Sequence, residues 1–173
     1  MHLNDSAVTD SCKFVESDFF TGGDTFTIFD TEYWKFGIGI WYDVNFPDYS
    51  HILWREFGAD FLVFPSAYSQ TSGEYGLWDA VRRGRALDEQ VYLAMVSPAR
   101  PKEDKEKYQS YGYSSVVNPW GQVIADSDEK EALVLWDINM NLVHDSREQM
   151  PCYKQRRHDL YSKIHLVNNE TKD

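Results

Sequence analysis

The chain contains 173 residues and carries 17 Lys and Arg against 28 Asp and Glu, a formal net charge of −11. This length suits one domain. With 42% hydrophobic and 16% aromatic residues, the composition is too apolar for a disordered chain. Because an excess of negative charge repels phosphate backbones and anionic lipids, we expect neither a nucleic-acid partner nor a membrane partner.

Targeting segments and metal motifs are the next features to consider. The start of the chain lacks a basic region followed by an apolar run, and no apolar stretch reaches the roughly 20 residues of a membrane-spanning helix. We therefore predict a soluble, cytoplasmic protein. Cys12 and Cys152 match no C-x-x-C spacing and are expected to be free thiols. The histidines are scattered and Gly37-x-Gly39 lacks the third glycine of a dinucleotide fingerprint, so we predict no metal and no cofactor.

The first regular elements form a strand–turn–helix unit. Short β-branched and aromatic runs predict strands at Thr25–Asp30 and Trp34–Ile40. The second run alternates only partly, which is typical of a buried central strand whose end opens into a site. Pro47 suits the first turn of a following helix, and Gly58 ends it.

A second unit of the same kind follows. Ala59–Pro65 predicts another buried strand, cut by its final proline, because proline cannot donate to a sheet ladder. After a polar loop at Ser66–Gly76, the apolar stripe of Leu77–Gln90 predicts a helix, and Val91–Val96 predicts the next strand.

The last third of the chain is less regular. Ser97–Tyr113 is rich in Pro, Lys and Glu and is expected to be a surface excursion. The turn residues of Asn118–Gly121 predict a hairpin between Ser114–Val117 and Gln122–Ala125. We then predict a strand, a short helix, a basic arm and a frayed tail, at Glu131–Ile138, Asn139–Gln149, Met150–Tyr161 and residues 166–173, respectively.

This order of elements predicts a mixed α/β fold. The chain offers about six strands but only two well-patterned helices, too few to cover both faces of a sheet. One face of the sheet is therefore expected to need a partner sheet.

Two residues are candidates for a functional site. Trp41 directly follows a predicted strand, at the end where α/β proteins place reactive groups. An indole has a single N–H donor, however, so it neither attacks a carbonyl nor moves a proton. Glu16 is a carboxylate in a mixed segment, where a solvated surface group is commoner than a general base.

A family resemblance is carried by Gly37–Asp43 (GIGIWYD) and by short segments spread over nearly the whole chain: Thr21–Phe26, Gly58–Pro65, Arg85–Asp88, Gln90–Tyr92, Ser97–Arg100, Val116–Gly121 and Arg156–Tyr161. Together they resemble the carbon–nitrogen hydrolase (nitrilase) superfamily. In order and spacing they are similar to its omega-amidase branch.

The resemblance implies a fold and a chemistry. The family's fold is a four-layer α-β-β-α sandwich, of which this chain would form a part, with residues 1–165 as the C-terminal portion of a single domain. In the family a cysteine attacks an amide or nitrile carbon, ammonia or an amine leaves, and water hydrolyses the thioester. A Glu acts as general base, a Lys stabilises the oxyanion and a second Glu supports the site. The omega-amidase branch acts on short dicarboxylic monoamides such as alpha-ketoglutaramate.

Transferred residue by residue, the family's site is incomplete in this chain. The second Glu corresponds to Glu16 and the nucleophile position to Trp41, whereas the Lys and the first Glu have no counterpart. Asn45 stands where an Arg is expected, and further departures fall at Ser66, Leu77, Glu89 and Tyr113. We therefore predict an inactive protein, in which the indole occupies space meant for the reacting carbon and impairs substrate binding.

Three interpretations remain open. The chain is an inactive homologue that keeps a relic pocket for a small amide and forms a homo- or hetero-dimer. Alternatively it is a fragment of a larger, active carbon–nitrogen hydrolase, although Trp41 argues against activity. The third interpretation is a non-catalytic binding or dimerisation partner.

Overall fold

The structure is a computed structural model that describes residues 1–7, 13–101 and 108–161. Its centre is a six-stranded sheet whose strands lie side by side in chain order: β3 (Thr27–Asp30), β4 (Lys35–Ile38), β5 (Phe61–Pro65), β6 (Tyr92–Val96), β7 (Ser115–Val117) and β8 (Val123–Asp126). Strands β4, β5 and β6 are parallel, and the outer pairs are antiparallel. β4 is thus an internal strand, as its partial alternation predicts.

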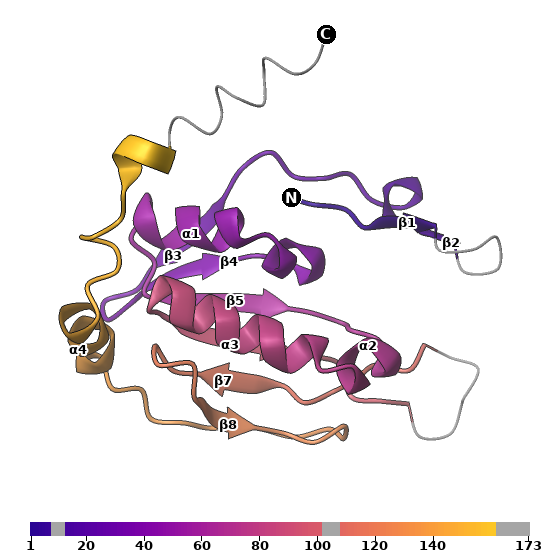
Figure 1. The fold of residues 1–173 in the computed structure, drawn as a ribbon. Coiled ribbons are helices and arrows are strands. Elements are labelled where there is room, and N and C mark those ends of the chain that lie inside the picture. Colours follow the sequence, from indigo (N-terminus) through magenta and orange to yellow (C-terminus); the bar gives the residue numbers. More distant parts are fainter. Residues whose placement is uncertain (8–12, 102–107, 162–173) are drawn as a thin grey trace, which may run out of the picture.

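Two helices cover one face of this sheet. α1 (Pro47–Arg55) connects β4 to β5, and α3 (Leu77–Glu89) connects β5 to β6. Both lie on the same side of the sheet, as Figure 1 shows. The short α2 (Gln70–Glu74) precedes α3, and α4 (Asn141–Gln149) packs beside one end of the sheet.

The N-terminal segment forms a small ribbon beside this body. Strands β1 (Asp5–Ala7) and β2 (Lys13–Val15) pair antiparallel and continue into the 3-10 turn η1 (Glu16–Asp18). A second 3-10 turn, η2 (Trp41–Asn45), follows β4. The ribbon projects from the same end of the molecule as α2 (Figure 1).

The main core lies between the helices and the sheet. Leu62 and Phe64 of β5 are fully buried against Leu53 of α1 and Trp78 of α3. Gly37 lets α1 approach the sheet closely, since a Cβ at this position would stand 3.1 Å from the Cβ atom of Leu53 in α1. These contacts fix α1 directly over the strand that leads into η2.

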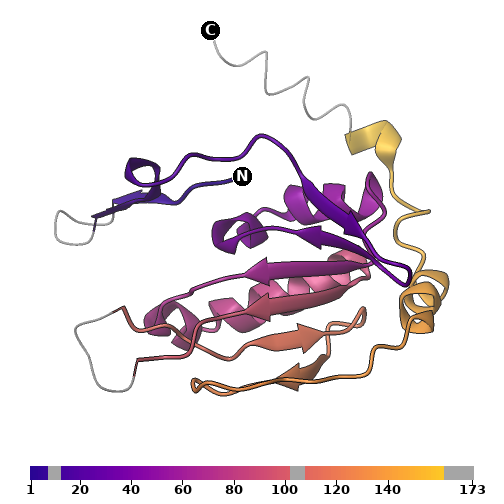
Figure 2. The same ribbon diagram turned by 180° about the vertical axis from the view of Figure 1, so that it is seen from behind.

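The opposite face of the sheet is also apolar. Phe61, Tyr92 and Ala94 are buried there, together with Val143 of α4. Seen from this side, the described chain places no helix across the middle of the sheet (Figure 2). The described residues thus supply one helical layer and one sheet layer of the four-layer sandwich implied by the resemblance.

Most predicted elements occur within two or three residues of their expected bounds, but residues 131–138 do not form the predicted strand. Leu133 and Leu135 are 84% and 79% exposed. A strand is stabilised by hydrogen bonds to a neighbouring strand, and in the described part of the chain this segment pairs with none. The alternation of apolar residues at 131–138 predicts an extended backbone, but it does not predict which strand, if any, this segment pairs with.

Two features were not predicted at all. The β1–β2 ribbon has strands of only three residues, too short for a periodic signal. α2 begins where the Ser69 hydroxyl accepts a hydrogen bond from the Ser72 N–H at 3.2 Å, a capping arrangement inside the predicted polar loop. The predicted arm is largely exposed and ends in a helical turn, whereas the predicted tail at 166–173 lies outside the described residues.

Among the described residues, no helix is both long enough and apolar enough to cross a membrane.

Candidate functional site

The turn after β4 has an unusual backbone. Its first residue, Trp41, has a φ of +41°, in the left-handed region that residues other than glycine rarely adopt. Backbone strain of this kind persists only when the surroundings enforce it, and it clusters at functional sites. The turn at the carboxyl end of β4 is therefore the first candidate site.

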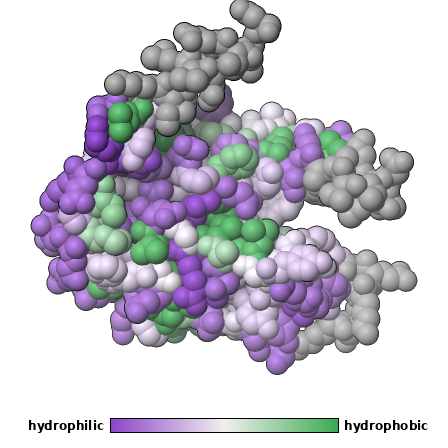
Figure 3. All heavy atoms as spheres, in the orientation of Figure 1, coloured by the Kyte–Doolittle hydropathy of each residue, from purple (hydrophilic) through white to green (hydrophobic). Residues whose placement is uncertain are grey.

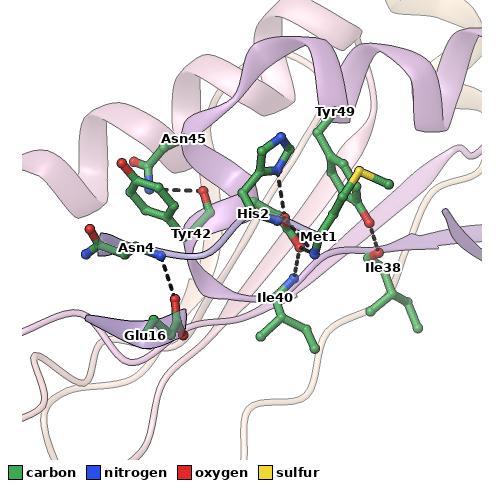
Figure 4. A network of polar contacts seen from close by, with 10 residues as sticks. Met1, His2, Asn4, Glu16, Ile38, Ile40, Tyr42, Asn45 and Tyr49 are labelled. Carbon is green, nitrogen blue, oxygen red and sulfur yellow. Dashed lines mark hydrogen bonds and ion pairs between the residues drawn. The ribbon is translucent and has the colours of Figure 1, made fainter. Parts of the chain in front are cut away.

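Asp43, which is 1% exposed, holds this turn in place. Its carboxylate accepts hydrogen bonds from the Ile40 N–H at 2.9 Å and the His2 N–H at 2.7 Å, and the Met1 ammonium lies at 3.1 Å (Figure 4). Burial alone would raise the pKa of Asp43, but these hydrogen bonds outweigh it and the pKa is lowered. Burial and the Asp43 charge together raise the pKa of the nearby Tyr49 to about 12. The anionic carboxylate thus ties the N-terminal segment to η2.

Glu16 lies at the start of η1 and is half-buried. Its Oε2 atom accepts a hydrogen bond from the Asn4 N–H at 2.7 Å (Figure 4). It lines a cavity of about 520 Å³ together with residues of the N-terminal segment and of β3 and β4, and Asp43 and Tyr49 also belong to the lining. The carboxylate is therefore positioned by the ribbon backbone.

A second and larger cavity, of about 1000 Å³, lies where β4 and β5 end. We call it the β4–β5 cavity, and its described lining residues are Asn4, Trp41, Tyr42, Asn45, Ala67, Tyr68, Ser69, Ser72, Leu77 and Tyr108. In the space-filling view, the molecule is hollowed between the part that carries β1 and β2 and the part that carries α2 (Figure 3). The carboxyl ends of parallel strands are the usual place for ligands in α/β folds.

The two predicted site residues line different cavities. Trp41 faces the β4–β5 cavity, whereas Glu16 lines the smaller one. Asn4 connects them, since its backbone N–H binds Glu16 while the residue also lines the larger cavity. Trp41 forms part of the wall of the larger cavity, and the expectation that its indole occupies the space of the reacting carbon stays a prediction.

Several site residues escaped prediction. Asp43 was only part of a motif, and neither its burial nor its bond to His2 could be anticipated. Tyr68 follows the end of β5, the same signal that singled out Trp41. Tyr108 comes from the predicted surface excursion, and its hydroxyl donates to the Ala67 carbonyl at 2.6 Å. A loop residue that reaches a cavity through a contact with a distant segment belongs to no periodic pattern, so the sequence alone does not identify it.

The described ranges contain no group of three or more His, Cys, Asp or Glu side chains that could hold a metal ion. Cys152 is a free, exposed thiol and lines neither the Glu16 cavity nor the β4–β5 cavity. Cys12 lies outside the described residues.

Comparison with known proteins assigns the family. The profile of the family described as Carbon-nitrogen hydrolase matches residues 1–148. The chain belongs to the carbon–nitrogen hydrolase family. It is 42% identical over 162 residues to "Omega-amidase NIT2" of Xenopus tropicalis, covering 94% of this chain and 57% of that protein. The human protein of the same name is 41% identical over 162 residues, with the same coverage.

Solved structures agree with the fold. Saccharomyces cerevisiae Nit3, a member of branch 10 of the nitrilase superfamily, superposes with a TM-score of 0.75 at 37% identity, covering 82% of this chain and 51% of that one. The Caenorhabditis elegans NitFhit protein gives a TM-score of 0.82 at 34% identity, covering 93% and 38%. The chain thus spans about half the length of the relatives that it matches, and its α/β fold is that of the nitrilase superfamily.

Proposed function

We propose that this chain is a catalytically inactive member of the omega-amidase-like branch that retains a ligand cavity. The observation that carries the proposal is Trp41 at the head of η2, on the wall of the β4–β5 cavity. It occupies the position that, by the family resemblance, belongs to the nucleophilic cysteine. Its left-handed φ supports this correspondence, because a strained turn after a strand is where an exposed reactive side chain is expected.

An indole cannot perform the reaction. Thioester formation requires a thiolate to attack the amide carbon, and tryptophan offers only a ring N–H donor. Loss of a nucleophile typically lowers turnover on the order of 10⁶-fold. Glu16, even if correctly placed, would then have no covalent intermediate to support.

Ammonia release from alpha-ketoglutaramate tests the proposal. We expect no release above the buffer blank. A Glu16→Gln variant is the control, since release caused by a contaminating amidase would persist in it. Release by the unaltered chain that disappears in Glu16→Gln would contradict inactivity.

A second variant tests the position itself. Trp41→Cys should place an accessible thiol on the cavity wall, because the parent residue lines open space. We expect mass spectrometry to find iodoacetamide on residue 41 of this variant. Absence of labelling there, with Cys152 labelled in the same sample, would show that position 41 does not face an open cavity.

Two other roles remain as alternatives. An active hydrolase of greater length would need a thiol to replace Trp41, and Cys152 lies away from both cavities. A non-catalytic homo- or hetero-dimer partner needs no catalysis at all. An intact mass of the endogenous protein above 20.2 kDa would favour the longer hydrolase. A native mass above the intact mass would favour the dimer partner.

A further inference from the structure

Four of the ten described lining residues of the β4–β5 cavity are aromatic. Trp41, Tyr42, Tyr68 and Tyr108 contribute four rings to its lining. Burial raises the pKa of both Tyr68 and Tyr108, so both phenols are neutral at physiological pH. Aromatic walls favour flat, apolar ligand surfaces, which stack on them or meet them edge-on.

The polar groups of the lining are neutral as well. They are the carboxamides of Asn4 and Asn45 and the hydroxyls of Ser69 and Ser72. The Asn45 amide is held in place, because its oxygen accepts from the Tyr68 hydroxyl at 2.9 Å and its nitrogen donates to the Tyr42 carbonyl at 3.3 Å. Figure 4 shows the Asn4 carboxamide directed away from Glu16. Such groups can orient an uncharged amide through hydrogen bonds.

No described lining residue is a cation. Arg85 lies behind the wall, where its guanidinium donates to the backbone carbonyls of Val44 at 3.0 Å and Asn45 at 3.3 Å. The same guanidinium pairs with Asp88 at 3.6 Å. A carboxylate bound in this cavity would therefore find no cation for a direct ion pair among the described lining residues, and the hydration that it loses would not be compensated by them. The net charge of −11 adds a long-range repulsion of anions.

We propose that the β4–β5 cavity binds a neutral, flat ligand with an amide group, of the class of the aromatic carboxamides, in preference to anionic dicarboxylic monoamides. The cavity volume of about 1000 Å³ is ample for a substituted aromatic ring. The inference rests on the proposed function in one respect, namely that the ligand is bound and not hydrolysed.

The experiment compares two probes on the unaltered full chain. Benzamide represents the neutral aromatic carboxamides and succinamate the anionic monoamides. Dissociation constants come from saturation-transfer NMR titrations at pH 7, and ammonia release is measured in the same samples. We expect benzamide to bind at least about tenfold more tightly than succinamate, since an uncompensated carboxylate easily reaches the free-energy difference that corresponds to a factor of ten.

A matched pair of variants locates the site. Ser72 lines the cavity, whereas its neighbour Thr71 on α2 is exposed and does not line it. Ser72→Arg should reverse the preference in favour of succinamate, and Thr71→Arg should leave both dissociation constants unchanged. The comparison of probes on the unaltered chain does not depend on either variant folding.

Each result separates this inference from the proposed function. Equal or tighter binding of succinamate, or no binding of benzamide up to its solubility limit, would overturn the inference and leave inactivity intact. Binding of benzamide with release of ammonia would overturn inactivity and support the ligand class. Tighter benzamide binding that Thr71→Arg weakens as much as Ser72→Arg does would place the site outside the β4–β5 cavity and overturn the inference.

Discussion

Two glycine-to-alanine substitutions should change stability in opposite directions. Gly39 follows β4, where an added Cβ would stand 2.7 Å from Tyr49 Cε1 and 2.9 Å from Phe64 Cδ1. Tyr49 and Phe64 are buried, and the Tyr49 hydroxyl is fixed to the Ile38 carbonyl at 2.8 Å. Carbon atoms prefer about 3.5–4.0 Å, so the rings must shift by roughly 1 Å.

The expected cost is that of overpacking a rigid core. Gly39→Ala should lower the free energy of unfolding by about 1–3 kcal/mol, which corresponds to a melting temperature about 4–8 °C lower for a loss near 2 kcal/mol in a domain of this size. Gly84 provides the comparison, since it lies inside α3 with no atom within 4 Å of an added Cβ. Gly84→Ala should raise the stability by about 0.5–1 kcal/mol, because alanine is the better helix former.

Urea unfolding followed by tryptophan fluorescence measures both effects. The signs of the two changes are the decisive readout, because a general effect of an added methyl group would move both variants in the same direction. If Gly39→Ala is as stable as the parent, α1 and the end of β4 are not packed as described. If Gly84→Ala is destabilised, α3 is not a regular, open helix at that residue.

Two further substitutions test the polar contacts behind α3. Glu89 is buried against His51, and burial, only partly offset by the His51 hydrogen bond, raises its pKa. A raised pKa makes the Glu89 contribution to stability largest below the unfolded value near 4.5, and this contribution is lost as pH rises through the folded value. Glu89→Gln should therefore gain stability relative to the parent between pH 4.5 and 8 in urea titrations, and a difference that shrinks as pH rises would refute the argument. The amide nitrogen of Gln90 donates to the Ser146 and Met150 carbonyls, each at 2.9 Å. Gln90→Met should cost about 1–3 kcal/mol, the net contribution of two hydrogen bonds, since each carbonyl keeps only its backbone donor, the N–H of Met150 or Cys152. Hydrogen exchange in α4 should accelerate; unchanged α4 protection would mean that this anchor is unimportant.

The local character of most elements could be predicted from the sequence. The partly alternating run before Trp41, the proline at the start of α1 and the stripe of α3 each depend on the spacing of neighbouring residues. The family resemblance came from short motifs of the same kind, and the comparison with known proteins confirms it. Such patterns can be recognised in the sequence because backbone geometry and side-chain periodicity depend on neighbouring residues.

Features that depend on distant residues could not be predicted in this way. The pattern of residues 131–138 could not reveal that this segment pairs with no strand of the described sheet, because pairing is decided by the rest of the fold. Nor could the sequence show that Trp41 adopts a left-handed backbone, or that Asp43 is buried beneath its contact with His2. The contacts of Asp43 with Met1 and His2 arise only when the N-terminal segment packs against η2.

The proposed ligand class depends entirely on tertiary structure. Tyr68 and Tyr108 are separated in the chain by α2, α3 and β6, yet both line the β4–β5 cavity. Arg85 lies near the cavity but is not among its described lining residues, because its guanidinium is held by backbone carbonyls. Through the family resemblance, the sequence predicts that Trp41 stands at the position of the nucleophilic cysteine. Only the folded chain brings the aromatic residues of the cavity together, in a described lining that contains no cation.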